Sequence, residues 1–178
     1  RGIVRYNFVT QRFDSCGQLP VPPSTVHCFT EDAWSNIYCG TREGLLCWKR
    51  KTGAWENISE RFGVAKRLQL IKGLLFLEKD LLFASTEKRG FYKLNMKTGQ
   101  LDTFGFKVGN VEEYYLAMYG MERLNDNEIL VGTLSFGLIK FNVAKGTFSW
   151  PKGVLQKREG ILFNTDNSNY NFSTNFLG

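Results

Sequence analysis

The chain repeats one six-residue string four times, and this repetition constrains its fold more than any other feature. The string reads GIVRYN from Gly2, GLLCWK from Gly44, GFYKLN from Gly90 and GLIKFN from Gly137. The spacing of these glycines defines a unit of about 45 residues. Self-similarity at a period of this size is typical of solenoids, propellers and other arrays, in which each unit is one supersecondary motif.

Two further landmarks recur in each unit. An apolar residue follows each glycine after eleven residues, and these four residues are Phe13, Trp55, Leu101 and Phe148. A short strand-like segment that ends in threonine also recurs: SNIYCGT to Thr41, KDLLFAST to Thr86, NEILVGT to Thr133 and SNYNFST to Thr174. Each unit therefore contains the same ordered series of short segments.

The segments alternate apolar and polar residues with a period of two, which indicates strands. The turns KTG that end at Gly53 and Gly99 place glycine where a tight hairpin needs positive φ. The repeat around Gly90 contains four such strands, GLLFLE, DLLFAST, GFYKLN and QLDTFG. Four antiparallel strands per repeat form a β-propeller blade, and the lack of sustained helical spacing argues against helical solenoids.

The sequence therefore predicts an all-β chain that forms a single β-propeller region over residues 1–178. The predicted parts are the third and fourth strands of one blade at 2–16, blades at 24–60, 68–106 and 117–150, and the first and second strands of a blade at 161–178. The two end segments complement one another. They are expected to pair, within one chain as a closed four-bladed ring or between two chains as a larger ring, or else to be the ends of an arc from a propeller with more blades.

Two expectations follow for individual positions. The apolar residues Ile37, Leu82 and Ile129 occupy the same place in three units and are expected to be equivalent and buried between blades. The chain does not begin with Met and shows no signal-peptide pattern, so we expect it to be a processed or excised piece.

The charge pattern does not indicate a nucleic-acid partner. The net charge of +6 comes from 23 basic and 17 acidic residues, and the basic residues are scattered. Arg5, Lys93 and Lys140 occupy the same place in three repeats, which is typical of a solvated strand position.

No apolar run approaches the roughly 20 residues of a spanning helix, so we expect no direct membrane insertion by this segment.

The residue types argue for binding and against catalysis. His27 is the one histidine, so no second histidine could complete a metal pair. No phosphate-binding loop, nucleophile elbow or zinc spacing occurs. We therefore expect no catalytic residues, no metal and no cofactor.

Asp32 and Asp126 lie between first and second strands, where a carboxylate can stabilise a turn.

The four cysteines, Cys16, Cys28, Cys39 and Cys47, do not have metal-site spacing. A hairpin that turns between Ala33 and Trp34 would place Cys28 opposite Cys39, where an oxidising compartment could form a disulfide. The alternative, which we favour, is that the cysteines are small buried apolar side chains.

The repeat resembles that of the two-component regulator propeller family. That pattern is an acidic turn, Asn, an apolar strand, Gly-Thr, a short loop, Gly-Leu with an aromatic residue and Asn or Asp, then Thr-Gly and an aromatic residue. TEDAWSNIYCGTREGLLCWKRKTGAW (Thr30 to Trp55) follows it nearly throughout, and NDNEILVGTLSFGLIKFN (Asn125 to Asn142) follows it well. The sequence departs from it at Ala84-Ser85-Thr86 and at Ser173.

The resemblance implies a periplasmic or other extracytoplasmic sensor region of a hybrid two-component histidine kinase, which detects glycan fragments or another small polar ligand. The implied partners are a small polar ligand or oligosaccharide and the rest of the parent receptor, with a homodimer as a further option. The module itself would not be an enzyme. The alternatives are a non-catalytic protein-interaction or assembly scaffold and, with less support, a lyase on the same fold.

Propellers bind ligands on the face formed by the loops between second and third strands and between blades. In this chain those loops combine cations, carboxylates and aromatic rings, a mixture that suits sugars and acidic glycans. The candidate ligand-binding residues are Arg42, Glu43, Lys88, Arg89, Tyr114, Tyr115, Ser135 and Phe136.

Overall fold

The computed structural model describes residues 3–17, 19–20, 25–88, 90–108, 111–113, 117–134 and 136–151. Over these residues the chain consists of β-strands and a single short helix, α1 (Ile58–Arg61). Asn57 caps this helix, because its side chain accepts a hydrogen bond from the backbone N–H of Glu60. The expected all-β class is confirmed.

Twelve of the strands form three antiparallel sheets of four strands each. In each sheet the strands follow in chain order, so every neighbouring pair is a hairpin. The three sheets are β3 (Val26–Glu31), β4 (Ile37–Thr41), β5 (Leu45–Lys49) and β6 (Ala54–Asn57); β7 (Ile71–Glu78), β8 (Leu81–Thr86), β9 (Gly90–Asn95) and β10 (Leu101–Phe104); and β13 (Met118–Asn125), β14 (Glu128–Thr133), β15 (Gly137–Asn142) and β16 (Thr147–Ser149). Three repeats therefore form the predicted four-stranded unit.

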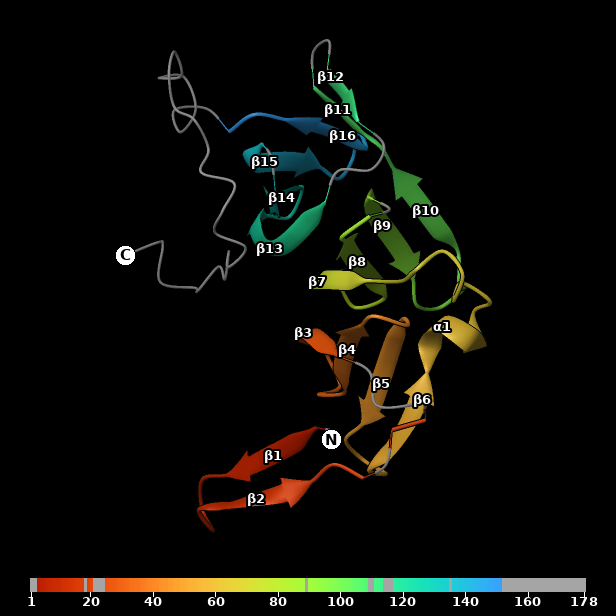
Figure 1. Cartoon of the computed structure of the whole chain (residues 1–178), viewed down its shortest axis with the longest axis vertical. Coiled ribbons are helices and arrows are strands. Elements are labelled where there is room, and N and C mark those ends of the chain that lie inside the picture. Colours follow the sequence, from red (N-terminus) through yellow and green to blue (C-terminus); the bar gives the residue numbers. More distant parts are fainter. Residues whose placement is uncertain are drawn as a thin grey trace.

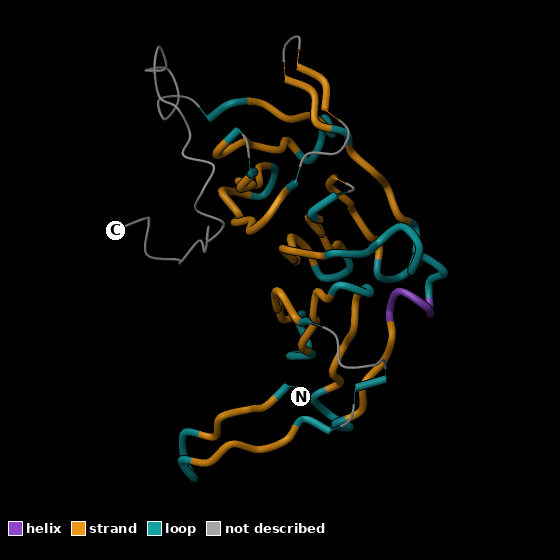
Figure 2. The backbone as a smooth tube through the Cα atoms, viewed as in Figure 1, coloured by secondary structure: helices purple, strands orange, loops and turns teal. Residues whose placement is uncertain are grey.

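The sheets follow one another along an open arc (Figure 1). Their first strands, β3, β7 and β13, lie toward the concave side, and β6 and β10 lie toward the convex side. The helix α1 connects the first two sheets on the convex side, as Figure 2 shows in purple. No ring closes within the described part of the chain, and the strands predicted at 161–178 lie outside the described residues.

A two-stranded hairpin of β1 (Val4–Asn7) and β2 (Arg12–Ser15) lies at one end of the arc (Figure 1). Its register is that of the third and fourth strands of the complete sheets. In all four units the residue four places after the glycine pairs with the residue eleven places after it: Tyr6 with Phe13, Trp48 with Trp55, Leu94 with Leu101 and Phe141 with Phe148. The recurring eleven-residue spacing is thus a cross-strand pair.

The recurring threonine and glycine close the turn between the second and third strands. The Oγ1 atom of the threonine donates to the glycine carbonyl at 2.9 Å for Thr41 and Gly44, 3.0 Å for Thr86 and Gly90, and 2.9 Å for Thr133 and Gly137. All three glycines have positive φ, which side-chain-bearing residues rarely adopt. These glycines open equivalent third strands, as expected.

Two apolar layers form the core, one between each pair of adjacent complete sheets. The first includes Tyr38, Leu45 and Leu82, and the second includes Phe83 and Ile129. Leu82 and Ile129 are fully buried, which confirms the expectation for these two residues. Ile37 is equivalent in register, because it pairs with Trp48 as Leu82 pairs with Leu94.

Ile37 is only half-buried, so the expectation of burial is wrong for this residue. The reason is that it faces the β1–β2 hairpin, which supplies only two strands to cover it.

One hairpin was not expected from the sequence. β11 (Phe106–Val108) and β12 (Val111–Glu113) pair between the second and third complete sheets, in a stretch interpreted as an inter-blade loop. Phe106 anchors the hairpin, because its side chain is fully buried in the second apolar layer. Its ring centroid lies 5.2 Å from that of Phe136 and 6.2 Å from that of Trp150.

The proposed pairing of Cys28 with Cys39 is wrong. The hairpin is centred on Trp34 and not between Ala33 and Trp34, so Cys28 pairs with Gly40 and Phe29 pairs with Cys39. All four cysteines are free thiols. Cys39 and Cys47 are fully buried, as expected for small apolar side chains, whereas Cys16 and Cys28 are half-buried.

Candidate functional site

We call the described residues of the loops between second and third strands the loop rim (residues 42–43, 87–88, 134 and 136). In each complete sheet the residue after the recurring threonine donates its backbone N–H to the residue just before the first strand. These bonds run from Arg42 to Thr25 (3.3 Å), from Glu87 to Leu70 (3.0 Å) and from Leu134 to Ala117 (3.0 Å). Leu70 also donates to the Arg42 carbonyl at 2.9 Å, which links the rims of two sheets.

Each first strand carries a β-bulge beside this rim. His27 is the extra residue between the pairs Val26–Thr41 and Cys28–Gly40, and Lys72 is the extra residue between Ile71–Thr86 and Gly73–Ser85. In β13 the bulge holds Tyr119 and Gly120, between Met118–Thr133 and Met121–Val131. A bulge redirects a side chain and often lies beside a functional site. We call His27, Lys72 and Tyr119 the bulge cluster.

Charged groups of the loop rim surround the bulge cluster. The Nζ atom of Lys72 lies 3.0 Å from Oε2 of Glu87. The hydrogen bond from Lys72 lowers the pKa of Glu87, which keeps this carboxylate ionised. Burial, and then the positive charge of Lys72, lowers the pKa of His27 from its ordinary value of 6.5, so this imidazole is neutral at pH 7. Burial also raises the pKa of Tyr119, so its phenol remains a hydrogen-bond donor.

The expected ligand residues divide into three groups in the structure. Arg42, Glu43 and Lys88 are exposed on the loop rim. Phe136 is half-buried, and its ring packs against Phe106 and Trp150, which leaves less of its face accessible. The remaining four candidates, Arg89, Tyr114, Tyr115 and Ser135, lie outside the described residues.

Sequence reasoning missed the bulge cluster as a group. Lys72 and Tyr119 were not candidates, and His27 was considered only as a metal ligand. The available signal was positional: each of the three residues follows the residue that pairs with the recurring threonine. That pairing becomes visible only when the register of the first and second strands is known.

Within the described ranges no group of three or more His, Cys, Asp or Glu side chains is placed to hold a metal ion. Burial raises the pKa of the Cys28 and Cys39 thiols to about 12, so both are protonated at neutral pH and are poor nucleophiles.

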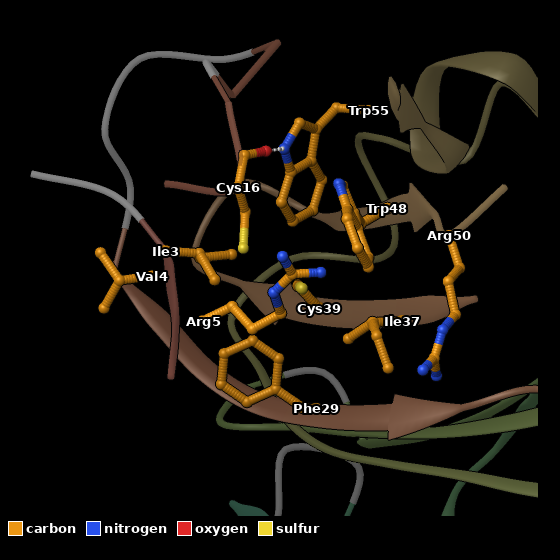
Figure 3. Close-up of a pocket in the computed structure, with 10 residues that line it drawn as sticks. All are labelled: Ile3, Val4, Arg5, Cys16, Phe29, Ile37, Cys39, Trp48, Arg50 and Trp55. Atoms are coloured by element: carbon orange, nitrogen blue, oxygen red, sulfur yellow. Dashed lines mark hydrogen bonds between the residues drawn. The ribbon is translucent and has the colours of Figure 1, made fainter. Parts of the chain in front are cut away.

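A pocket lies between the β1–β2 hairpin and the first complete sheet. It is a mostly apolar pocket of about 370 Å³. Figure 3 shows Trp48, Trp55 and Phe29 around it, together with the guanidinium groups of Arg5 and Arg50. The Nε1–H group of Trp55 donates to the carbonyl of Cys16 at 2.7 Å, which ties the hairpin to β6. None of the expected ligand residues lines this pocket.

No helix in the described ranges has both the length and the apolar character needed to cross a membrane.

No protein-family model matches the chain, and no curated protein matches it either. Solved structures do match. The computationally designed Ika4 protein is 12% identical with a TM-score of 0.53, and the match covers 76% of each chain. The extracellular domain of the putative hybrid two component system BT3049 from B. thetaiotaomicron is 18% identical with a TM-score of 0.52. This match covers 94% of the present chain and 27% of that domain, so the chain spans about a quarter of its length.

A third match, the β-propeller domain of Cps50 (Swd1) from Myceliophteria thermophila, has a TM-score of 0.49 at 11% identity and covers 72% of this chain and 38% of that one. At such identities the likeness concerns the fold alone. The arc of four-stranded antiparallel sheets is by itself a propeller-like all-β architecture.

Proposed function

We propose that the chain is the ligand-sensing β-propeller module of an extracytoplasmic two-component receptor and that it binds a small polar ligand, such as an oligosaccharide, at the bulge cluster and the loop rim. The proposed location is periplasmic or otherwise outside the cytoplasm. Support comes from the repeat pattern of the sequence and from the similarity in fold to an extracellular domain of a putative hybrid two component system.

One observation carries the location of the site. Three first strands bulge at the same place, yet the residue that follows the threonine's partner is histidine in β3, lysine in β7 and tyrosine in β13. A bulge that served only the fold would not require three different polar groups. A constant backbone with varied side chains is what a binding surface needs, since the backbone fixes positions and the side chains determine selectivity.

The chemistry of the cluster suits a neutral or zwitterionic polar ligand. The Lys72–Glu87 pair offers both donors and acceptors, and Tyr119 adds a phenol and an aromatic face. The positive charge of Lys72 is balanced by Glu87, so a strongly anionic ligand would gain little. Hydroxyl groups of a sugar could hydrogen-bond to the pair while an apolar ring face packs on the tyrosine.

In this proposal the module binds and does not catalyse. The protonated Cys28 and Cys39 thiols are consistent with that role. A lyase built on the same fold would need a base within reach of its substrate, and His27 is the residue to exclude by mutation.

A glycan library tested against the isolated chain is the experiment for this proposal. We expect saturable binding of at least one oligosaccharide, and a loss of at least tenfold in affinity for Tyr119→Ala and for Lys72→Ala. The control is Asp126→Ala, because Asp126 lies in the turn between first and second strands, at the opposite end of the sheet from the loop rim. Binding that the control weakens as much as the cluster variants do, or no binding at all, would contradict the proposed site.

A second candidate function is a protein-interaction or assembly scaffold. The outer face of the β1–β2 hairpin favours it, because Val4 is 61% exposed and Phe13 is 71% exposed. Exposed apolar patches on soluble proteins often mark interaction sites. Sedimentation of the chain over a range of concentrations tests this function: self-association that Phe13→Ser abolishes would support it, and a monomer at all concentrations would argue against self-assembly.

A further inference from the structure

Leu70 adopts a backbone conformation that its side chain disfavours. Its φ is 53°, in the left-handed region, which residues with a large side chain rarely adopt. Gln11 and Ser35 are the other non-glycine residues with positive φ in the described ranges, and both lie in hairpin turns, where this conformation is common. Leu70 instead lies directly before β7, the first strand of a sheet, where no hairpin turn requires it.

Buried residues on both sides hold Leu70 in this conformation. Leu68 and Ile71 are fully buried in the first apolar layer, so the chain turns from the loop after α1 into β7 within the two residues between them (Figure 2). The loop itself is fixed, because Leu68 donates its backbone N–H to the carbonyl of Val64 at 2.9 Å. An unfavourable φ persists only where the surrounding structure determines it, and such residues often lie at binding sites.

Both backbone polar groups of Leu70 contact the loop rim. Its N–H group donates to the carbonyl of Arg42 at 2.9 Å, and its carbonyl accepts from the N–H group of Glu87 at 3.0 Å. Arg42 belongs to the first complete sheet and Glu87 to the second, so one residue joins the rims of two sheets. Because peptide planes are rigid, φ and ψ determine how these two groups point relative to one another. A change of φ at Leu70 would therefore redirect at least one of them.

The same residue fixes both members of the ion pair at the rim. Lys72 follows Leu70 by two residues, at the bulge of β7, and Glu87 is held through its backbone N–H group. The side chains of Lys72 and Glu87 are 18% and 34% exposed, so water covers only part of the pair. The hydrogen bond from Lys72 is the main cause of the lowered pKa of Glu87. This pKa therefore reports whether the pair is in place.

We propose that the left-handed backbone of Leu70 is the positioning element of the candidate site: it holds the loop rims of the first two complete sheets in one arrangement and places Glu87 against Lys72. Leu70 acts through its backbone and not through contact of its side chain with a ligand. The consequence for a ligand rests on the proposed function, whereas the consequence for the ion pair does not. A site held in its binding geometry in advance has fewer groups to order when the ligand binds, which favours affinity.

Two substitutions separate the backbone from the side chain. Leu70→Ile keeps the side-chain volume, but a β-branched residue tolerates positive φ poorly. Leu70→Gly removes the half-buried side chain, but glycine adopts positive φ without steric cost. We expect the pKa of Glu87 to stay low in the glycine variant and to rise toward its ordinary value of 4.5 in the isoleucine variant. NMR titration of the Glu87 carboxyl carbon measures it.

Backbone amide exchange supplies a second readout with an internal reference. The N–H group of Leu134 donates to the Ala117 carbonyl at 3.0 Å, at the place in the third complete sheet that corresponds to the Glu87–Leu70 bond. We expect Leu70→Ile to accelerate exchange at Glu87 and not at Leu134. Faster exchange at both amides would indicate a general loss of stability and would contradict the positioning role.

Leu101→Ile is the matched control. It makes the same change at a half-buried residue of β10, at the end of the sheet away from the loop rim, because Leu101 pairs with Leu94 and not with the start of β9. We expect it to leave the pKa of Glu87 and the exchange of both amides unchanged.

The glycan library tests the consequence for binding. For the oligosaccharide that binds the unchanged chain most tightly, we expect Leu70→Ile to lower the affinity roughly tenfold more than Leu70→Gly does. If no glycan binds, the proposed function fails, and the two NMR measurements decide the positioning role by themselves.

Two further results would overturn the inference. One is a Leu70→Ile variant in which the pKa of Glu87 stays low and its amide exchanges as in the unchanged chain. The other is a Leu70→Gly variant that loses the low pKa of Glu87, since the side chain and not the backbone conformation would then hold the pair. The glycine variant keeps the test decisive if Leu70→Ile does not fold.

Discussion

Three positions of the repeated string have identifiable structural roles. The glycine supplies positive φ, and the threonine before the loop hydrogen-bonds to its carbonyl. The residue three places after the glycine forms an ion pair across the hairpin in two repeats, Arg5 with Asp14 at 3.1 Å and Lys93 with Asp102 at 2.8 Å. The asparagine that ends the string accepts backbone N–H groups of the next turn, as Asn95 does from Lys97 at 2.9 Å and from Thr98 at 3.0 Å.

Thr41→Val tests the threonine cap. The Thr41 hydroxyl donates to the Gly44 carbonyl and accepts from the N–H groups of Glu43 and Gly44, and the residue is fully buried. Valine keeps the shape but leaves these groups unpaired, so we expect a loss of about 1–3 kcal/mol in the free energy of unfolding. Urea unfolding measures it. The control Thr147→Val, on an exposed position of β16, should change stability by less than about 0.5 kcal/mol.

His27 makes stability depend on pH in a defined direction. Its pKa in the folded chain is below the ordinary value of 6.5, so the unfolded chain binds a proton more readily. Stability should therefore fall as pH drops through 6.5 toward the folded pKa. Glu87 acts in the same direction but only near and below its ordinary pKa of 4.5. Urea unfolding at pH 8 and at pH 5.5 should show a smaller loss in His27→Gln than in the unchanged chain, and an equal loss would refute the assignment.

At the scale of the sheets, one cross-strand pair between the first and second strands contains a glycine in each of the first two complete sheets. The glycine lies on the second strand in one sheet and on the first strand in the other. In the first complete sheet Cys28 on β3 pairs with Gly40 on β4. In the second sheet Gly73 on β7 pairs with Ser85 on β8. The departure from Gly-Thr at Ser85 is thus accompanied by a glycine on the adjacent strand, and the Ser85 hydroxyl donates to the backbone carbonyl of Tyr119 on the next sheet.

Gly73→Ala should be more destabilising than Gly40→Ala. A Cβ atom at Gly73 would lie 2.5 Å from the backbone oxygen of Tyr119, which cannot move without shifting β13. The two atoms nearest to a Cβ atom at Gly40 would be the Cys28 sulfur and the Ile71 Cγ2 methyl, and both can shift by side-chain rotation. We expect the Gly73 variant to lose roughly 1–3 kcal/mol and the Gly40 variant less, measured by urea unfolding. The reverse order would show that the sheets do not pack at this distance.

Phe83→Ala should remove much of the stability of the second apolar layer. The side chain is fully buried, and its ring lies 5.5 Å from that of Phe91 and 5.9 Å from that of Phe141. Its truncation leaves a cavity, with an expected loss of roughly 3–5 kcal/mol in the free energy of unfolding. Phe29→Ala is the matched control, because Phe29 is 54% exposed and should cost less than about 1 kcal/mol. Similar losses for the two variants would contradict the described layers.

At the scale of the whole molecule, most of the repeat architecture could be predicted from the sequence. Fixed spacing located the third and fourth strands of all four units, because their register depends on local turns. The bulges in β3, β7 and β13 could not be predicted, since one extra residue in a strand leaves no mark in the alternation here. The Cys28–Cys39 pairing was wrong by one residue because the hairpin turns around Trp34 and not between Ala33 and Trp34.

The hairpin of β11 and β12 and the apolar pocket were also beyond sequence reasoning. The hairpin replaces a short connection between two sheets, and its position depends on the burial of Phe106 in a layer made by distant residues. The pocket is lined by residues of β1 and of the first complete sheet, and the repeat pattern alone does not predict the space between them. The candidate site could be predicted in its loops, at Arg42, Glu43 and Lys88, but not in its bulges.

The central claim is that four units share one strand register, so that three complete sheets and one half-sheet follow along an arc. Cross-strand NOEs in an isotope-labelled sample test it most directly. We expect NOEs across all four pairs Tyr6–Phe13, Trp48–Trp55, Leu94–Leu101 and Phe141–Phe148, and between Gly40 and Ile71 of adjacent sheets. A register displaced by one residue in any of these hairpins, or no contact between Gly40 and Ile71, would contradict the account.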